Sequence, residues 1–228
     1  MRKIVLILFL LTGMGLSKAQ THELGVFLGG SNYVGDIGAT NHINPNQLAF
    51  GVLYKWNKSS RYSWRASFTV SDIVGDDADS DIRARNQRGF EFRNTVRELS
   101  VGLEFNFLEF NLHNFSKPIT PYLYGGLSYF NSSELFFDNG VAIGNGNRNT
   151  FAIPMTLGIK GKLGQRIIIG AEVGARYTFT DNLDGSNPRD AATTQFRFGG
   201  LNTDDWYVFS GITITYTFGK KPCYYCFE

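Results

Sequence analysis

Two cysteines near the end of the chain are the residues whose spacing most directly suggests chemistry. Cys223 and Cys226 flank Tyr224 and Tyr225 in the tail 219–228. A lone Cys-x-x-Cys indicates zinc only weakly, because zinc needs two further ligands. It is equally weak for a thioredoxin-type site, which lies at the start of a helix. In an oxidising compartment we expect a disulfide, between the two cysteines or from one of them to a partner. Because buried aromatic side chains often dominate interfaces, we interpret all four residues as a partner-binding tail.

Histidines and acidic runs are the other candidates for chemistry. His22 precedes the first expected strand, while His42 and His113 lie in expected connections. A small barrel enzyme would need a histidine, a serine and an acid at one level, and we predict no catalytic residue here. The acidic run 75–81 could attract calcium, but it lacks the glycine and distal glutamate of an EF-hand loop. The run 178–185 could likewise bind an ion, but Asn and Asp also form turns that end strands. We expect no metal and no cofactor.

Long alternating strands are the elements that must position these residues. The segment 166–181 alternates between an apolar face and a small or polar face, which is the period of a β-strand. It is longer than the five or six residues usual in globular proteins, and it suits a tilted membrane crossing whose polar face points inward. The apolar face holds Ile167, Ile169, Ala171, Val173, Ala175, Tyr177 and Phe179.

The first residues, 1–19, have the parts of a secretory signal peptide: a basic start, the apolar run 4–11 and a small-x-small cleavage site. Removing the three bases of this leader from the 22 in the chain leaves 19 bases against 20 acids. A nucleic-acid partner is therefore not expected, because such domains carry a strongly basic face. The domains we predict are a signal peptide at 1–19, a barrel at 20–218 and a periplasmic tail at 219–228.

Eight strands can be placed along the chain, and the connections between them alternate in length. Long connections are expected at about 34–47, 75–89, 132–149 and 182–204, and short ones at 57–61, 108–119 and 164–165. This asymmetry is typical of bacterial outer-membrane barrels. We predict an all-β, eight-stranded antiparallel transmembrane barrel in contact with outer-membrane lipids, with both termini in the periplasm. The expected strands are 23–34, 48–56, 62–74, 90–107, 121–131, 151–163, 166–181 and 206–218.

Charged residues on the polar parity should point into this barrel. An eight-stranded barrel has an interior that side chains can fill, so we predict a plugged barrel rather than a diffusion pore. The residues expected to pair with one another inside are Arg65, Glu98, Glu104, Glu172 and Arg176.

Several short motifs, taken in order, resemble the PorG-like outer-membrane barrels of the type IX secretion system of Bacteroidetes. They cover nearly the whole mature chain: ELGVFLGGSNYVGD at 23–36, IVGDD at 73–77, EFNF at 104–107, PYL at 121–123, IP at 153–154, RYTFTDNLD at 176–184 and DDWY at 204–207. The resemblance implies a non-enzymatic barrel that anchors or positions the periplasmic ring of the secretion and gliding machinery. Its partners would be the ring lipoprotein and that lipoprotein's soluble partner, bound through periplasmic turns and tail.

Two alternatives remain open. One is a surface-exposed barrel of the small OmpA/OmpX-like type, whose long loops bind an extracellular ligand or which stabilises the envelope. The other is a lipid-modifying barrel enzyme, which would require a converging His–Ser–acid set at the rim. A soluble calycin-like barrel is the rival at the level of the fold, but it would not need outward Ile and Val on nearly every strand.

Overall fold

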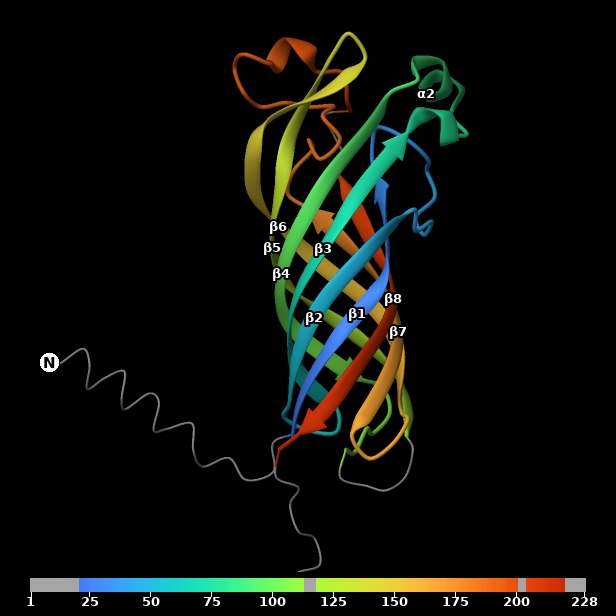
Figure 1. Cartoon of the computed structure of the whole chain (residues 1–228), viewed down its shortest axis with the longest axis vertical. Helices are drawn as coiled ribbons and strands as arrows, with labels where there is room; N and C mark the ends of the chain where they lie inside the picture. Colours follow the sequence, from blue (N-terminus) through green and yellow to red (C-terminus); the bar gives the residue numbers. More distant parts are fainter. Residues whose placement is uncertain (1–20, 113–117, 201–203, 220–228) are drawn as a thin grey trace, which may run out of the picture.

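Eight antiparallel strands close into one barrel in chain order, with β1 paired to β8 (Figure 1). The computed structural model describes residues 21–112, 118–200 and 204–219. The predicted fold class, an all-β eight-stranded antiparallel barrel, is confirmed. The strands are β1 (Thr21–Val34), β2 (Gln47–Asn57), β3 (Tyr62–Asp76), β4 (Glu91–Asn106), β5 (Ile119–Asp138), β6 (Val141–Lys162), β7 (Ile167–Thr178) and β8 (Trp206–Phe218).

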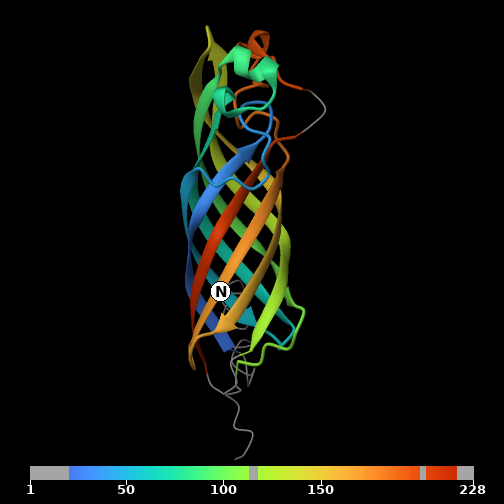
Figure 2. The same cartoon turned by 90° about the vertical axis from the view of Figure 1, so that its right-hand side faces the viewer.

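The two ends of the barrel differ in how the strands are joined (Figure 2). β1 begins and β8 ends at what we call the turn end, where β2 and β3 are joined through 58–61. The opposite loop end carries the connections after β1, β3 and β7 and the turn between β5 and β6. Its short helices are η2 (Asp77–Asp79), α2 (Arg83–Arg88) and η3 (Thr194–Phe196). Among the described residues, no helix is long and apolar enough to cross a membrane. The expected signal peptide lies outside the described residues.

Alternation sorts the side chains of every strand between lumen and exterior. In β4, for example, even-numbered residues are buried and odd-numbered ones are mostly exposed. The exterior is apolar on all eight strands, as a surface against hydrocarbon must be. Its large exposed side chains include Leu28, Val52, Phe68, Leu99, Val101, Leu123, Leu127, Ile153, Leu157, Ile169 and Ile212.

Aromatic side chains border this apolar belt on both sides. Towards the loop end, Tyr129 packs on Phe151 with ring centroids 5.3 Å apart, and Tyr177 packs on Trp206 at 5.1 Å. The ring towards the turn end consists of Tyr54, Trp64, Phe105, Phe107, Tyr216 and Phe218. Such girdles lie at membrane–water interfaces, so the belt between them spans the outer membrane.

A charge placed in the middle of the belt should be costly. Leu157 on β6 is 61 % exposed on the outer face, and we expect Leu157→Arg to lower the free energy of unfolding in lipid vesicles by about 2–4 kcal/mol. Asn147→Arg, on the same strand but beyond Phe151, serves as the matched control and should change it little. Equal effects of the two substitutions in a urea titration would contradict a belt at this height.

The prediction of a long connection at 132–149 is wrong, because β5 and β6 continue through these residues as a hairpin. A two-residue turn joins them, with Asn139 at φ 50° and Gly140 at φ 83°. Asn-Gly with both φ values positive is the strongest short hairpin signal, since that turn matches the twist of the strands. Polar, glycine-rich residues on β6 hid the strand, and a register shift beyond Ser133 marks a bulge there.

Candidate functional site

The lumen contains a network of buried charges centred on Glu104 and Glu172. Arg65 of β3 donates from both terminal nitrogens to the two oxygens of Glu172 on β7, each at 2.7 Å. Tyr122 of β5 donates its hydroxyl to the same carboxylate. The Arg65 guanidinium also lies 4.9 Å from the centre of the Tyr124 ring. A bidentate pair fixes geometry as well as charge, so three strands that are not neighbours are held together across the lumen.

Glu104 of β4 receives cations from three directions. Lys55 Nζ lies 2.7 Å from Glu104 Oε2, and Lys160 Nζ lies 2.5 Å from Oε1. Arg65 is more distant, at 3.6 Å. All of these groups are at most 4 % exposed. Because a buried charge is tolerated only when it is paired, the carboxylate and its three bases depend on one another.

A second group lies nearer the loop end. Arg176 of β7 sits 3.3 Å from Glu98 of β4 and donates to the Gly174 carbonyl at 2.6 Å. Tyr207 of β8 donates its hydroxyl to Glu98 at 2.6 Å. The guanidinium also stacks 4.5 Å above the centre of the Phe209 ring. This group joins β4, β7 and β8 through one carboxylate.

All five charged residues that alternation pointed inward lie in the lumen, and the structure brings them together in these two groups. Arg65 pairs with Glu172 and Glu104, and Arg176 pairs with Glu98. Lys55, Lys160 and the partner tyrosines were not among the sequence candidates. The inward orientation of the two lysines could have been predicted from the sequence, because Lys55 and Lys160 alternate with exposed apolar residues of β2 and β6.

At the turn end, an apolar cluster covers the charged lumen. Phe110 and Leu112 follow β4, and both pack with Ile168 as buried residues. The Lys160 ammonium lies 4.8 Å from the centre of the Phe110 ring, and Lys162 donates to the Leu112 carbonyl at 3.2 Å. The chain after β4 therefore folds back under the barrel instead of leaving its mouth open.

At the loop end, residues 182–187 enter the mouth of the barrel, and we call them the inserted loop. All of them are buried. Asn182 donates to the Leu135 carbonyl at 3.1 Å, and Asn94 of β4 donates to the Leu183 carbonyl at 2.8 Å. The Leu183 N–H donates to Asp205 at 2.8 Å. The side chains of Asn94 and Asp205 thus satisfy backbone groups of a segment that has no ladder of its own.

The carboxylates of Asp36, Asp181, Asp184 and Asp205 gather around the inserted loop. Burial, with the nearby charges of Asp36 and Asp184, raises the pKa of Asp181 to about 7. Burial also raises the pKa of Asp184, and burial with the charge of Asp184 raises that of Asp205 well above its usual range. Tyr33 donates its hydroxyl to Asp205. Buried carboxylates this close hold protons at a higher pH than solvated ones.

The acidic run 75–81 forms an ordered, salt-bridged structure. Asp77 is buried and accepts from Arg88 Nε at 2.7 Å and from the N–H groups of Gly38 and Phe90. These hydrogen bonds outweigh burial and lower its pKa. In the described part of the chain, no group of three or more His, Cys, Asp or Glu side chains is arranged to hold a metal ion.

The two described histidines lie at opposite ends of the barrel. His22 belongs to β1 at the turn end, where its Nδ1 lies 2.7 Å from the Tyr54 hydroxyl. His42 is exposed in the connection between β1 and β2 at the loop end. His113 and the tail residues Cys223, Tyr224, Tyr225 and Cys226 lie outside the described residues, so the expected disulfide and docking role stay predictions.

The charged groups of the lumen link the strands of the barrel to one another. They face other charged groups of the same chain, and together they join β2 to β8 across the interior. Such a network fixes strand positions relative to one another, because each carboxylate accepts from at least two elements. The geometry therefore braces the barrel from within.

Several solved structures are similar to this barrel. Neisserial surface protein A is similar with a TM-score of 0.50 and 8 % identity, over 88 % of this chain and 98 % of that one. Ail of Yersinia pestis, solved in complex with the heparin analogue sucrose octasulfate, has a TM-score of 0.48 and 11 % identity over 88 % and 100 %. The N-terminal barrel domain of OprF from Pseudomonas aeruginosa has a TM-score of 0.44 and 9 % identity over 88 % and 98 %.

A search of curated proteins found no match. One family model matches residues 2–228, and its description is a domain of unknown function, DUF6089. The apolar belt, the aromatic girdles and the closed eight-stranded fold make the protein a small β-barrel of the bacterial outer membrane. With nearly its whole length covered by that model, the chain belongs to the DUF6089 family.

Proposed function

We propose that this barrel is a non-enzymatic anchor that positions the periplasmic ring of the type IX secretion and gliding machinery at the outer membrane. Its partners in this proposal are the ring lipoprotein and that lipoprotein's soluble partner. The proposal rests on the ordered motifs that resemble PorG-like barrels, from 23–36 to 204–207. The turn end is taken to face the periplasm, as it does in outer-membrane barrels with short turns on that side.

The observation that carries an anchoring role is the braced lumen. Glu104 accepts from Lys55 and Lys160, and Glu172 accepts from Arg65, all within 3.0 Å and all buried. Ion pairs that cross the lumen oppose the passage of a solute and resist deformation of the wall. A barrel of this kind suits the transmission of force or position better than transport through its interior.

Contact with the ring is assigned to the turn end and to the tail that follows β8. β8 ends at Phe218, beside the start of β1, so a tail at 219–228 continues from the turn end. Its aromatic residues, Tyr224 and Tyr225, and its cysteines, Cys223 and Cys226, are the proposed contacts. Buried aromatic anchors would supply much of the binding energy. A disulfide between the flanking cysteines would restrict the free tail, so that less conformational entropy is lost on binding.

The first experiment isolates outer membranes under non-reducing conditions and compares the wild type with Cys223→Ser and Cys226→Ser. We expect the ring lipoprotein to co-purify, and a heavier reducible species would show that one cysteine bonds to that partner. Tyr224→Ala/Tyr225→Ala should reduce co-purification, whereas Lys220→Ala, in the same tail, is the matched control. A barrel that folds and inserts normally but co-purifies with no ring component would overturn the proposal.

The alternative is a surface-exposed barrel that binds an extracellular ligand or stabilises the envelope, and the loop end favours it. There the β5–β6 hairpin projects beyond the last pairing of β4 with β5, Arg97↔Asn131 (Figure 1). The inserted loop is held in place by Asn94, which donates to the Leu183 carbonyl. Deleting 219–228 separates the two functions. Loss of secretion supports the anchor, and retained secretion with a binding defect on loop-end substitutions supports the alternative.

A further inference from the structure

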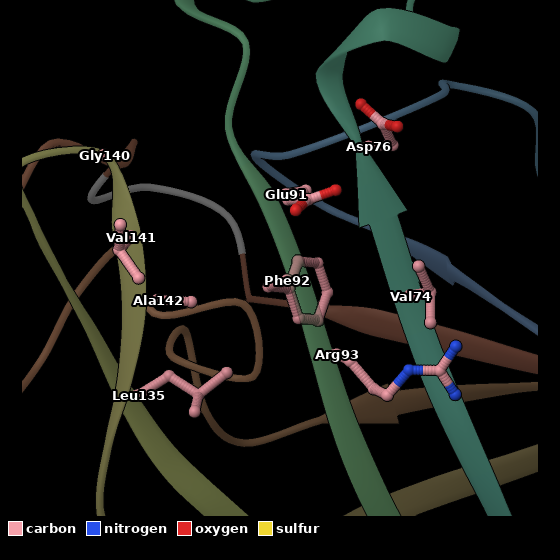
Figure 3. Close-up of a pocket in the computed structure, with 9 residues that line it drawn as sticks. All are labelled: Val74, Asp76, Glu91, Phe92, Arg93, Leu135, Gly140, Val141 and Ala142. Carbon is pink, nitrogen blue, oxygen red and sulfur yellow. The ribbon is translucent and has the colours of Figure 1, made fainter.

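The barrel wall splits at the loop end between β4 and β5. The pairing of β3 with β4 continues up to Asp76↔Glu91. The pairing of β4 with β5 stops earlier, at Arg97↔Asn131, after which β5 continues only with β6. Over 91–96, β4 therefore has a strand neighbour on one side and an open edge on the other, facing the hairpin (Figure 3).

Hydrogen bonds elsewhere on β4 show which residues aim their backbone at this opening. The Asn106 N–H donates to Arg61 on the β3 side, and Asp77 on that side donates to the Phe90 carbonyl. The Phe107 N–H donates instead to Pro121 on the β5 side. Antiparallel strands alternate these directions residue by residue, and the register of β4 is constant in both pairings. Odd-numbered residues thus face β5, and in the split these are Glu91, Arg93 and Thr95.

The chain satisfies one edge of the split and leaves the other open. On β5, the Asn94 side-chain amide donates to the Ser133 carbonyl at 2.8 Å and accepts from the Ser133 N–H at 2.9 Å. Asn182 donates to the Leu135 carbonyl. On β4, the gap-facing backbone groups of 91, 93 and 95 have no partner among the described residues. An open edge of this kind is a template for another strand.

A cleft of about 450 Å³ lies along this edge. It is lined on one side by β3 and β4 and on the other by the hairpin, including Leu135 and Val141 (Figure 3). Asp76 and Glu91 lie directly opposite each other across β3 and β4. Like charges in that position are destabilising, and neither carboxylate forms an ion pair with a described residue. Arg93 also lines the cleft but pairs with Asp72 at 2.8 Å, so the charges of Asp76 and Glu91 lie beside the unpaired strand edge without a paired base among the described residues.

We propose that this edge docks an extended polypeptide segment of another protein, which adds to β4 as a strand and places a lysine or arginine against Asp76 and Glu91. The edge from Glu91 to Thr95 spans about 13 Å at the strand rise of about 3.3 Å per residue, enough for a segment of about five residues. Such a segment displaces the hydrogen bonds between Asn94 and Ser133 at its inner end. Only a peptide backbone offers donors and acceptors at the repeat that this edge requires, and strand addition is a common mode of peptide recognition. The site is at the end of the barrel opposite the proposed ring contact, so it is independent of that function.

The test uses the full-length barrel in detergent micelles and a synthetic peptide of alternating lysine and valine, followed by NMR. We expect saturable binding that slows hydrogen exchange at the amides of Glu91, Arg93 and Thr95. Arg93→Pro should weaken binding at least tenfold, because proline removes an N–H that faces the gap while sparing the β3 ladder. Arg93→Thr loses the same side chain but keeps the N–H, and it should bind like the wild type.

A second comparison separates strand addition from charge attraction. Asp76→Asn/Glu91→Gln should weaken binding severalfold while keeping the slowed exchange, since Asn retains the hydrogen bond that Asp76 accepts from Ala78. A peptide of the same sequence with alternate backbone nitrogens methylated should not bind. The proposal is overturned if the methylated peptide binds as tightly, if Arg93→Pro binds normally, or if no saturable peptide binding occurs. Protection of the edge by an oligosaccharide but not by the peptide would also overturn it.

Discussion

Replacing Glu104 with glutamine is expected to lower the free energy of unfolding by about 3–5 kcal/mol. The carboxylate is fully buried and neutralises Lys55 and Lys160, with Arg65 at 3.6 Å. Glutamine preserves the volume and the hydrogen-bonding capacity of the side chain, but it leaves the positive charges of those bases without the negative charge that balances them. An uncompensated charge in a water-poor interior is what makes the loss large, rather than the missing contacts themselves. Urea titration of the folded barrel, followed by tryptophan fluorescence, measures the change.

Two further variants make the Glu104 result specific. Glu109→Gln removes a carboxylate that is 71 % exposed and 3.5 Å from Arg61, so it should change the free energy of unfolding by less than about 0.5 kcal/mol. Adding Lys160→Met to Glu104→Gln removes one stranded charge and should recover part of the lost stability. If the double variant is as unstable as the sum of two independent losses, Glu104 does not act by neutralising Lys160.

Alternation in the sequence was sufficient to assign the side of the wall on which a charge lies, but it could not pair the charges. Arg65 and Glu172 are 107 positions apart, and they meet because strands on opposite sides of the barrel reach the same height. That height depends on the stagger of all eight strands. The tyrosines posed a different problem, because Tyr122 and Tyr124 lie on a strand where both faces looked apolar. Only closure of the barrel shows that both rings point inward.

At the loop end, the sequence contains a signal for the β5–β6 hairpin but none for the inserted loop. The Asn139–Gly140 pair is a sufficient signal for the hairpin. The polar composition around it made the two strands hard to recognise, because strands beyond the membrane need no apolar face. The inserted loop has no comparable signal. Asp181, Asp184 and Asp205 come together with Tyr33 through the fold, and no period in the sequence relates them.

The inserted loop is expected to open as the pH rises. Asp181 has a pKa of about 7 in the folded barrel, against an ordinary value of 3.8, and the pKa values of Asp184 and Asp205 are raised in the same direction by burial and by one another. Groups that bind protons more tightly in the closed form stabilise it fully below about pH 4 and lose that contribution as the pH rises through about 7. Because Asp181 is partly solvated, we discount its share and expect hydrogen-exchange protection of residues 182–187, corrected for intrinsic rates, to fall roughly ten- to a hundredfold between pH 5 and pH 8.

Two substitutions identify the source of that pH dependence. Asp181→Asn removes the charge that Asp36 and Asp184 oppose, so protection at pH 8 should rise and the profile should flatten. Asp190→Asn is the control, because Asp190 is an exposed acid of the same connection whose pKa is lowered by the Ala192 N–H and Asn145. Protection that increases with pH in the wild type, or a profile that Asp181→Asn leaves unchanged, would contradict the assignment of the loop's closure to protonated acids.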